Sequence, residues 1–322
     1  TMQELPTPEP TETQLLVRMK ASSINIDDIH VAEGTFFGGL SSSSASAEKP
    51  SIPGVDVCGT VTKVGTKVTG FAAGDDVVGI LMPKPGRGTW AQYCCVEARL
   101  AIPKPASYSF EEAAACAIAG KTAANAVTSS KTTAGDVCVV VGASGGIGST
   151  VVQILSKQGV KVTGVCSGKN AEFVTGLGAE RIVDYTKSAF GDQLKGVRVD
   201  AVIDCVGGLE VEAQGMGILK KSGRFVTLCG PDKYIGETRI GKLGVCRMLA
   251  YVGWRALVTL GGPRYIMGGI GSSLTSLQEL ILNNNIKPPI DRNLTFNETE
   301  VKEGVAYIAS HRARGKVVIT IT

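Results

Sequence analysis

The sequence has few of the side chains that usually carry hydrolytic chemistry. It contains only two histidines, His30 and His311, and neither lies in a motif that would give it a triad partner. Catalysis by a serine or cysteine triad is therefore not expected. Asp27, Asp28 and His30 could meet on one side of a helical turn, but two carboxylates and one imidazole make a sparse metal site. Capping of a helix N-terminus by Asp27 or Asp28 is the favoured interpretation.

Blocks of like charge and long uncharged apolar runs are also missing. With 33 basic and 29 acidic residues, the net charge of +4 gives no field strong enough to imply a nucleic acid or an anionic membrane as partner. The longest apolar stretch, which begins at Leu243, is interrupted by Arg247 and Arg255. Since a membrane span needs about 20 mostly uncharged residues, no span is expected.

The nine cysteines give no sign of a disulfide framework. Their number is odd, and most of them lie in apolar or strand-like runs, namely Cys58, Cys138, Cys166, Cys205 and Cys229. We expect reduced, buried thiols in a reducing compartment, and therefore a cytoplasmic protein. The chain begins at Thr1 in what reads as the middle of a hairpin, so we expect that residues upstream have been lost. A mitochondrion or another organelle, with a targeting segment removed, is the alternative location.

Glycine is abundant, at 41 of 322 residues, and the hydrophobic pattern divides the chain into two kinds of region. Up to about Pro105, short alternating runs between Gly, Pro and Asp turns predict an antiparallel β domain. The polar stretch 38–50 within it is expected to be a flexible surface loop without a function of its own. From Glu111 a helical segment is followed by alternating helices and strands, and these strands are continuously apolar. Strands buried on both faces predict a parallel sheet covered by helices.

The end of the chain, with its strand "GKVVITI", again looks like the first region. We therefore expect an α/β protein in which a doubly wound parallel sheet domain is inserted in a mainly antiparallel β domain. The predicted boundaries are 1–114 plus 288–322 for the β domain and 115–287 for the inserted domain.

A glycine-rich turn joins the first apolar strand of the inserted region to a helix, in "VCVVVGASGGIGSTVVQ". Gly142, Gly145 and Gly148 would let the backbone approach a pyrophosphate, which the free N–H groups of the helix's first turn bind. With further strand-helix units behind it, this turn predicts a dinucleotide site. A short-chain reductase loop also fits, through Gly142, Gly146 and Gly148. That class needs a tyrosine with a lysine four residues later, which no tyrosine of the chain has.

The second apolar strand indicates which dinucleotide binds. In "KVTGVCSGKN" the place where NAD enzymes carry an acidic residue holds Cys166 and Ser167, with Lys169 close by. A hydroxyl and a cation without a carboxylate suit a 2'-phosphate, so NADPH is the expected cofactor. The alternative is that Lys169 is only a solvated lysine at a helix start.

Together these motifs resemble the zinc-free medium-chain dehydrogenase/reductases, the quinone oxidoreductase group. The resemblance spans nearly the whole chain and includes "ASSIN", "PGVDVCGTVTKVG", "AAACAIAGKTAANAV", "VVVGASGGIGSTVVQ", "VDAVIDCVGG" and "RARGKVVI". The C-terminal half is most similar to the branch that contains reticulon-4-interacting protein 1. This resemblance implies a GroES-like catalytic domain, a Rossmann dinucleotide-binding domain and a homodimer.

The resemblance also implies roles for matched positions. A first set would hold the pyrophosphate or lie beside the cofactor: Thr122, Ser144, Gly145, Gly146 and Ile147. A second set would surround the adenosine 2'-phosphate: Ser167, Lys169 and Tyr185. A third set would pass under the ribose and nicotinamide: Val206, Gly207, Leu228 and Gly230. Tyr265 and the turn of Arg312, Ala313 and Arg314 match cofactor-contacting positions less closely, because the sequence around Tyr265 departs from the branch and Arg312 replaces a histidine.

Zinc-dependent members of the same architecture carry catalytic ligands that this chain lacks. The corresponding positions are Asn25, the pair Val55 and Asp56, and an apolar residue near Ile118. An amide and aliphatic side chains are poor ligands for zinc, and the four closely spaced cysteines of a structural zinc loop are missing. We therefore expect no metal.

The expected activity is hydride transfer from NADPH to a quinone or another conjugated carbonyl acceptor. An activated acceptor needs little Lewis acid help, so positioning in a dry site can supply much of the rate. Asn25 is expected to donate a hydrogen bond near the nicotinamide or the acceptor oxygen, with a polar loop cap as the alternative. Reduction of an enoyl or alkenal double bond, and an NADPH-binding sensor or crystallin-like module, remain as alternative functions. The apolar run Leu249 to Val258 is expected to pair sheet edges across the two-fold axis of the dimer.

Overall fold

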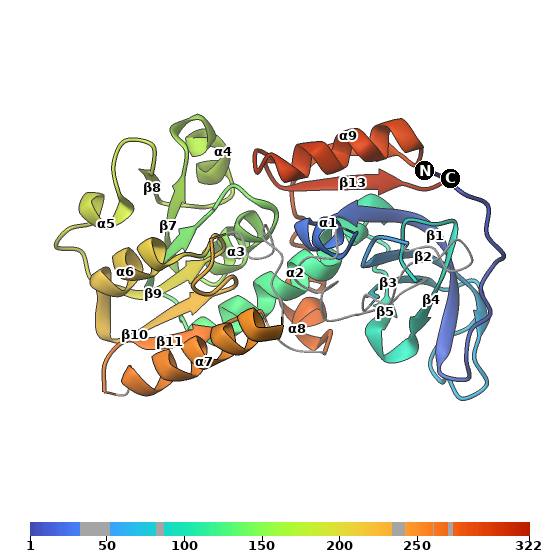
Figure 1. Ribbon diagram of the computed structural model, residues 1–322, viewed down its shortest axis with the longest axis horizontal. Coiled ribbons are helices and arrows are strands. Elements are labelled where there is room, and N and C mark those ends of the chain that lie inside the picture. The colour runs from blue at the N-terminus through green and yellow to red at the C-terminus, as the bar shows by residue number, and fades with distance from the viewer. Residues whose placement is uncertain (33–51, 82–86, 234–241, 260, 270–272) are drawn as a thin grey trace. The chain divides into compact units, whose positions relative to one another are not determined.

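The computed structural model describes residues 1–32, 52–81, 87–233, 242–259, 261–269 and 273–322. The chain forms two compact units (Figure 1). The first unit comprises Thr1–Gly120 and Ser272–Thr322, and the second unit comprises Lys121–Gly271. The polar stretch 38–50, which we expected to be a surface loop, lies outside the described residues.

The first unit is built on a seven-stranded sheet. Its strands are β1 (Gln14–Ile24), β2 (Asp56–Val64), β3 (Asp76–Ile80), β4 (Tyr93–Glu97), β5 (Ala101–Pro103), β12 (Ile290–Thr295) and β13 (Lys316–Thr320). The order is β12-β13-β1-β2-β3-β5, and β4 also pairs with β1. All pairs are antiparallel except β12 with β13. Pairing of Ile24 with Val317 brings the end of β1 beside the start of β13.

The helices of the first unit are α1 (Ile26–Ala32), η1 (Ala98–Leu100), α8 (Thr275–Leu277), the π-helical turn η3 (Gln278–Leu282) and α9 (Glu298–Ala309). The long helix α2 (Phe110–Ser130) contains the boundary between the two units, at Gly120 and Lys121. Alanines 113–115 of α2 are completely buried, so this alanine-rich stretch is a close-packed helix. Asn297 caps α9 by accepting the N–H of Glu300 at 2.9 Å.

The second unit is a six-stranded sheet in which every strand pair is parallel. Its strands are β6 (Val137–Val141), β7 (Lys161–Cys166), β8 (Arg181–Asp184), β9 (Val199–Asp204), β10 (Leu219–Thr227) and β11 (Arg264–Met267), in the order β11-β10-β9-β6-β7-β8. The helices between them are α3 (Gly146–Lys157), η2 (Gly168–Asn170), α4 (Ala171–Gly176), α5 (Phe190–Gln193), α6 (Leu209–Ile218) and α7 (Lys242–Val258). This is the doubly wound order, and it confirms the predicted fold class.

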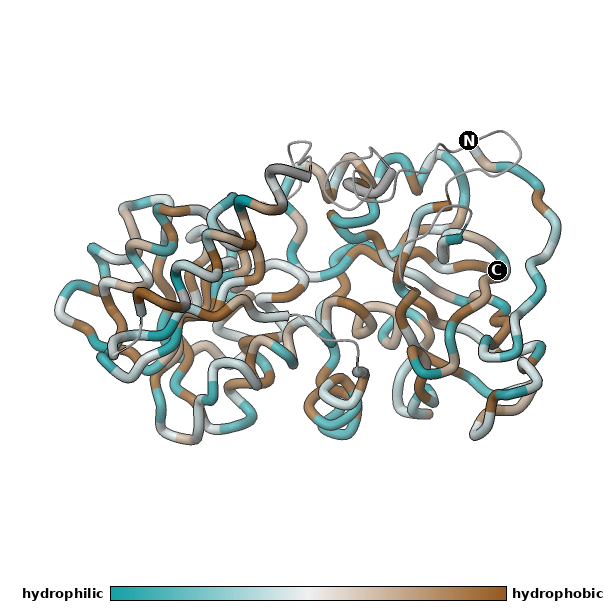
Figure 2. The backbone as a smooth tube through the Cα atoms, turned by 60° about the horizontal axis from the view of Figure 1, so that its bottom comes forward, coloured by the Kyte–Doolittle hydropathy of each residue, from teal (hydrophilic) through white to brown (hydrophobic). Residues whose placement is uncertain are grey.

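The core of the second unit explains why its strands are continuously apolar. Side chains of β6, β7, β9 and β10 are almost completely buried, including Val139, Val165, Val202 and Phe225. Figure 2 colours the backbone by hydropathy and shows hydrophobic segments within each unit. Helices on both faces of the sheet leave its central strands no solvent-facing side.

One sequence-based expectation about the second unit is wrong. The apolar run Leu249 to Val258 lies in helix α7 and therefore does not form a sheet edge. The free edge on that side of the sheet is β11, which pairs only with β10 among the described strands. Within the described part of the chain, no helix is long and apolar enough to span a membrane.

Candidate functional site

The glycine-rich turn between β6 and α3 forms a cradle of backbone atoms. Gly142 has a φ of 78°, which glycine adopts without strain. A Cβ on Gly148 would lie 2.1 Å from the carbonyl oxygen of Gly142, so the helix start and the turn pack too closely for any side chain. Gly145 is the N-cap of α3, and the first turn of the helix contains no acidic residue. The unpaired N–H groups of this turn therefore make a site for an anion such as pyrophosphate.

Ser144 links this cradle to the end of the next strand. Its hydroxyl accepts a hydrogen bond of 3.1 Å from the amide of Asn170. Asn170 is buried, and its Oδ1 has no hydrogen-bond partner among the described residues. A buried acceptor without a donor can be satisfied by a ligand hydroxyl, which fits a nucleotide ribose. Asn170 was not predicted, because its burial depends on the packing of η2 against the turn.

The end of β7 carries Ser167 and Lys169 as expected from the sequence, but a carboxylate also lies there. Asp184 ends the neighbouring strand β8 in register with Cys166. Its Oδ1 accepts hydrogen bonds from the hydroxyl of Thr186 at 2.7 Å and from the Thr186 N–H at 3.0 Å. These bonds, and one from the Gly168 N–H, lower the pKa of Asp184. The premise that this place lacks a carboxylate is wrong, because the ends of parallel strands meet at one sheet edge.

Lys169 and Tyr185 are both exposed on this edge of the second unit. Ser167, the residue directly after β7, is half-buried. The position of these side chains is compatible with an adenosine 2'-phosphate, and their role stays a prediction.

A buried hydrogen-bond network shapes the ends of β9 and β10. Asp204 is buried and accepts bonds of 2.9 Å from the N–H groups of Val206 and Gly207 and from the hydroxyl of Thr227. Thr227 in turn accepts the Gly230 N–H at 3.0 Å. Burial raises the pKa of Asp204, and the hydrogen bonds oppose that rise. The network holds three of the predicted cofactor positions together at the ends of β9 and β10, next to the point between β6 and β9 where the strand order reverses. Open α/β sheets bind ligands at such a point.

Thr122 and Leu228 approach the same backbone position from different elements. A Cβ on Gly269 would lie 2.9 Å from Cγ2 of Thr122 and 3.1 Å from Cδ2 of Leu228. The structure thus brings together two residues that are 106 positions apart in the sequence numbering. Contact of either residue with a cofactor stays a prediction.

Tyr265 lies in the core of the second unit, where its side chain is 4% exposed. Its ring stacks on Phe225 with a centroid distance of 5.7 Å and meets the edge of Tyr251 at 6.3 Å. These contacts give Tyr265 a packing role, and they do not bring it to the glycine-rich turn. Its contact with a cofactor stays a prediction.

Arg312, Ala313 and Arg314 form the turn between α9 and β13 in the first unit. Asp291 holds this turn by accepting the N–H of Arg314 at 2.8 Å and the hydroxyl of Tyr307 at 2.7 Å. Both arginine side chains are exposed. The turn is therefore fixed while its cations remain accessible, and a role at the cofactor stays a prediction.

Asn25 is the centre of a polar cluster in the first unit. Its amide group donates to Oδ2 of Asp56 at 2.7 Å and to Oδ2 of Asp28 at 3.2 Å, and its Oδ1 accepts a hydrogen bond from Lys316. Asp56 also accepts the hydroxyl of Ser23 and the N–H of Ile118. Both N–H bonds of the Asn25 amide are thus directed at carboxylates. From the sequence we expected Asn25 to donate a hydrogen bond near the nicotinamide or the acceptor oxygen. The sequence did not indicate that carboxylates accept both of its N–H bonds.

Asp28 lies in the first turn of α1 and is not its N-cap, and it has a property that was not expected. Its Oδ2 accepts the backbone N–H of Asn25 at 2.8 Å at the start of α1. Its Oδ1 is buried without a hydrogen-bond partner among the described residues. Burial, together with the nearby Asp56 charge, raises the pKa of Asp28 to about 8. The carboxyl group is therefore largely protonated at neutral pH.

Replacing Asp28 by asparagine should change how stability depends on pH. In the wild type, the folded pKa of about 8 lies above the ordinary value of 3.8, so the stabilisation by the protonated group is present below pH 3.8 and is lost as the pH rises through 8. We expect the free energy of unfolding of Asp28→Asn to rise relative to that of the wild type as the pH increases across this window. The difference should grow by up to about 1.4 kcal/mol per pH unit. Urea unfolding at several pH values measures the difference. A difference that does not change with pH would contradict the raised pKa, and Asp75→Asn in an exposed turn is the control.

The positions that we expect to correspond to the zinc ligands of related proteins are Asn25, the pair Val55 and Asp56, and an apolar residue near Ile118. The Asp56 carboxylate is already bonded to Asn25, Ser23 and Ile118. Within the described ranges, no three His, Cys, Asp or Glu side chains are grouped so that they could hold a metal ion.

Two family models match parts of the chain. Residues 11–106 match the family model of the alcohol dehydrogenase GroES-like domain, and residues 177–319 match that of a zinc-binding dehydrogenase. The chain is 31% identical over 319 residues to 2-methylene-furan-3-one reductase of Solanum lycopersicum, which covers 97% of this chain and 73% of the relative. It is 30% identical over 330 residues to the mitochondrial NAD(P)H oxidoreductase RTN4IP1 of Mus musculus, covering 96% and 82%. The structure of a quinone oxidoreductase from Coxiella burnetii superposes with a TM-score of 0.78 at 25% identity, covering 99% and 93%.

Proposed function

Because the chain belongs to the medium-chain dehydrogenase/reductase family of oxidoreductases, we propose that it is an NADPH-dependent, zinc-independent reductase that transfers hydride to quinones or other conjugated carbonyls. The observation that carries the proposal is the close-packed turn of Gly142, Gly145 and Gly148, which leads into the N-terminus of α3, where the first turn has no acidic residue and would bind a pyrophosphate. In this proposal the β domain, residues 1–114 plus 288–322, carries the catalytic residues. The inserted domain, residues 115–287, binds the cofactor.

The residues of the second unit fit NADPH. Ser144, Gly145, Gly146 and Ile147 would hold the pyrophosphate, and the unsatisfied Oδ1 of Asn170 would accept a ribose hydroxyl. Val206, Gly207, Leu228 and Gly230 would contact the nicotinamide ribose. When bound, NADPH supplies the hydride from its nicotinamide ring.

The polar cluster of the first unit would orient the acceptor. Lys316 is buried, lies 4.0 Å from Asp56 and donates to Asn25, so a cation and an amide are fixed at one place without a metal. Because both N–H bonds of Asn25 are directed at carboxylates, Asn25 would hold Lys316 in place, and the fixed ammonium group would stabilise charge that develops on an acceptor oxygen. We propose that Asn25 acts as part of this cluster, and that an activated acceptor needs no stronger polarising group.

Replacing Asn25 by alanine removes three side-chain hydrogen bonds from the cluster. We expect turnover to fall by about tenfold to a hundredfold, because the cluster loses its defined geometry. Steady-state kinetics, together with NADPH titration, measure the change. Unchanged turnover with unchanged NADPH affinity would show that Asn25 is only a loop cap.

Lys169 is the cation that we assign to the 2'-phosphate. We expect Lys169→Ala to weaken NADPH binding by about tenfold and NADH binding much less, since a charge-assisted bond to phosphate is lost. In this variant Lys169 no longer offsets the negative charge of the nearby Asp184 carboxylate, so that charge should weaken the binding of the 2'-phosphate further. Fluorescence titration with both cofactors measures the ratio, and Lys195→Ala, an exposed lysine of the same unit, is the control. Wild-type preference for NADH would overturn the NADPH assignment.

Reduction of a conjugated carbon-carbon double bond is the second candidate. It is favoured by the relative from Solanum lycopersicum, whose name specifies a methylene ketone. A panel with a benzoquinone, a phenanthrenequinone and an alkenal, each with NADPH and with NADH, separates the candidates. Faster turnover of the alkenal favours double-bond reduction. Tight NADPH binding without oxidation by any acceptor would instead favour a sensor or crystallin-like module.

The assembly and the compartment are also proposals. We propose a homodimer in which the free edge of β11 pairs with its copy, and the molecular mass in solution tests this. Cytoplasmic localisation stays our prediction, with an organelle as the alternative. The RTN4IP1 relative is mitochondrial.

A further inference from the structure

Helix α7 packs on the second unit with a polar side. Glu212 of α6 is buried and accepts hydrogen bonds of 3.0 and 2.9 Å from the hydroxyl of Tyr251. The side chain of Arg255 lies 2.7 Å from the same carboxylate. Arg255 also lies 5.5 Å from the ring centroid of Tyr265 in the core. The inward side of α7 therefore combines polar groups paired with a buried charge and the side chains of Tyr251 and Val252, which pack against the hydrophobic core.

The opposite side of α7 is apolar and faces solvent. Leu249, Trp254, Leu257 and Val258 are 61%, 53%, 68% and 51% exposed. We call these four residues, with Ala250 and Gly253 between them, the apolar stripe. Their spacing places them along one side of the helix. A surface helix normally turns its apolar side to the core and its polar side to water, so the exposed apolar stripe of α7 departs from the usual pattern.

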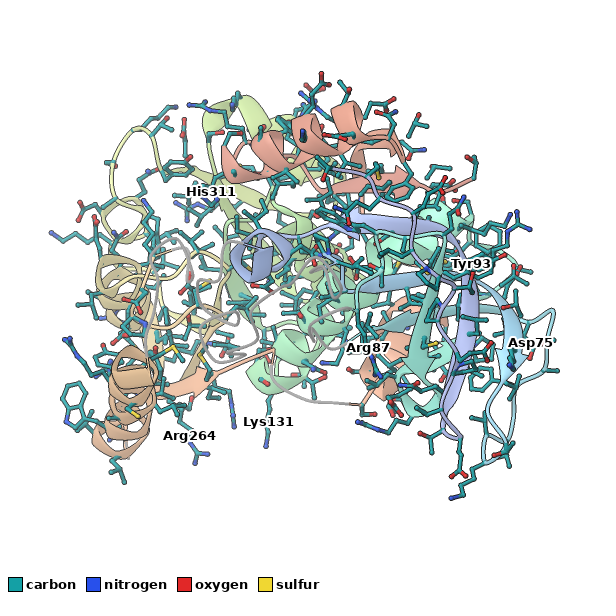
Figure 3. All side chains as sticks on the ribbon, turned by 45° about the vertical axis from the view of Figure 1, so that its right-hand side comes forward. Asp75, Arg87, Tyr93, Lys131, Arg264 and His311 are labelled. Carbon is teal, nitrogen blue, oxygen red and sulfur yellow. The ribbon has the colours of Figure 1, made fainter. Side chains whose placement is uncertain are left out.

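The charged side chains of α7 itself are all basic. Helix α7 contains no acidic residue, and its exposed Arg247 lies beside the stripe. Arg264, labelled in Figure 3, is exposed at the start of β11, the strand that packs against α7. A second copy of the stripe would bring like charges together, whereas an anionic surface would neutralise them. The net charge of the whole chain gave no sign of this, because the cations are local.

We propose that the apolar stripe of α7 docks on an anionic membrane surface, with the helix lying in the plane of the lipid headgroups. Leucine, valine and tryptophan side chains would enter the boundary between headgroups and acyl chains, and Arg247 would contact lipid phosphates. Tryptophan favours this interface because one edge of its ring is polar. This docking requires no span, and it does not depend on the identity of the electron acceptor.

Vesicle binding tests the proposal. The full chain is sedimented with phosphatidylcholine vesicles that do or do not contain phosphatidylglycerol. We expect binding to the anionic vesicles only, and weaker binding as salt is raised. The double variant Leu249→Gln with Leu257→Gln should lower the partition coefficient by at least about tenfold. Leu209→Gln, which replaces a leucine on α6 that is 58% exposed, is the matched control and should bind like the wild type.

Tryptophan emission provides a second readout that does not depend on the double variant. The chain has two tryptophans, Trp90 and Trp254. Vesicles should shift the emission of the wild type to the blue, and Trp254→Phe should remove this shift. The proposal is overturned if the wild type does not bind, if the double variant binds equally well, or if the double variant halves the molecular mass in solution. The last result would make the stripe a contact between subunits.

Discussion

Replacing Gly148 by alanine is expected to abolish tight NADPH binding. The new Cβ would lie 2.1 Å from the carbonyl oxygen and 2.8 Å from the carbonyl carbon of Gly142. Because both atoms belong to the backbone, the turn and the start of α3 must move apart. An overpacked backbone contact costs about 1–3 kcal/mol, and displacement of the N–H groups removes the anion site, so we expect at least about a hundredfold loss of affinity. Calorimetric titration with NADPH measures it.

The control for this prediction is Gly176→Ala in the same unit. A Cβ at Gly176 would have no atom within 4 Å, so NADPH affinity should not change. An unchanged affinity of Gly148→Ala would mean that the glycine-rich turn does not hold the cofactor. Circular dichroism of both variants separates a local change in the turn from unfolding.

Replacing Asp56 by alanine is expected to destabilise the first unit strongly. Asp56 is fully buried and accepts bonds from Asn25, Ser23 and the N–H of Ile118, and Lys316 lies 4.0 Å away. Its loss leaves the buried ammonium group of Lys316 without its counter-charge. Breaking one side of a buried ion pair costs about 3–5 kcal/mol. Urea unfolding, followed by far-ultraviolet circular dichroism, measures the free energy.

Asp75→Ala is the control for Asp56→Ala, because Asp75 lies in an exposed turn of the same unit (Figure 3). We expect a change below about 1 kcal/mol there. If Asp56→Ala were no more destabilising than the control, the cluster around Asn25 would not be a fixed structural unit. The proposal that it orients an acceptor would then lose its basis.

The sequence predicted the fold because the signals for it are local. The change from alternating to continuous apolar runs distinguishes an antiparallel sheet from a parallel one, and each pattern extends over only a few residues. The glycine-rich turn is equally local, since Gly142 and Gly148 are six positions apart and their close approach follows from the strand-turn-helix geometry. The close-packed glycine turn between β6 and α3 was therefore predictable.

Other parts of the site depend on contacts between distant segments. Lys316 reaches Asn25 across 291 positions, and Asp184 arrives beside Gly168 from another strand. No periodicity shows that these side chains meet, because the meeting is set by strand register. The orientation of α7 was hidden for a related reason. Tyr251 and Arg255 face inward from α7, where they contact the buried carboxylate of Glu212. That contact is not visible in the sequence, where the apolar run alone indicated a sheet edge.

The fate of the hydride tests the central claim most directly. NADPH that carries deuterium at the position that donates the hydride is incubated with the chain and an alkenal, and the reduced product is analysed by mass spectrometry. We predict that the product gains deuterium at its β-carbon as NADPH is consumed, and that NADH reacts more slowly. A reduced product without deuterium, or tight NADPH binding without oxidation by alkenals or quinones, would contradict the account.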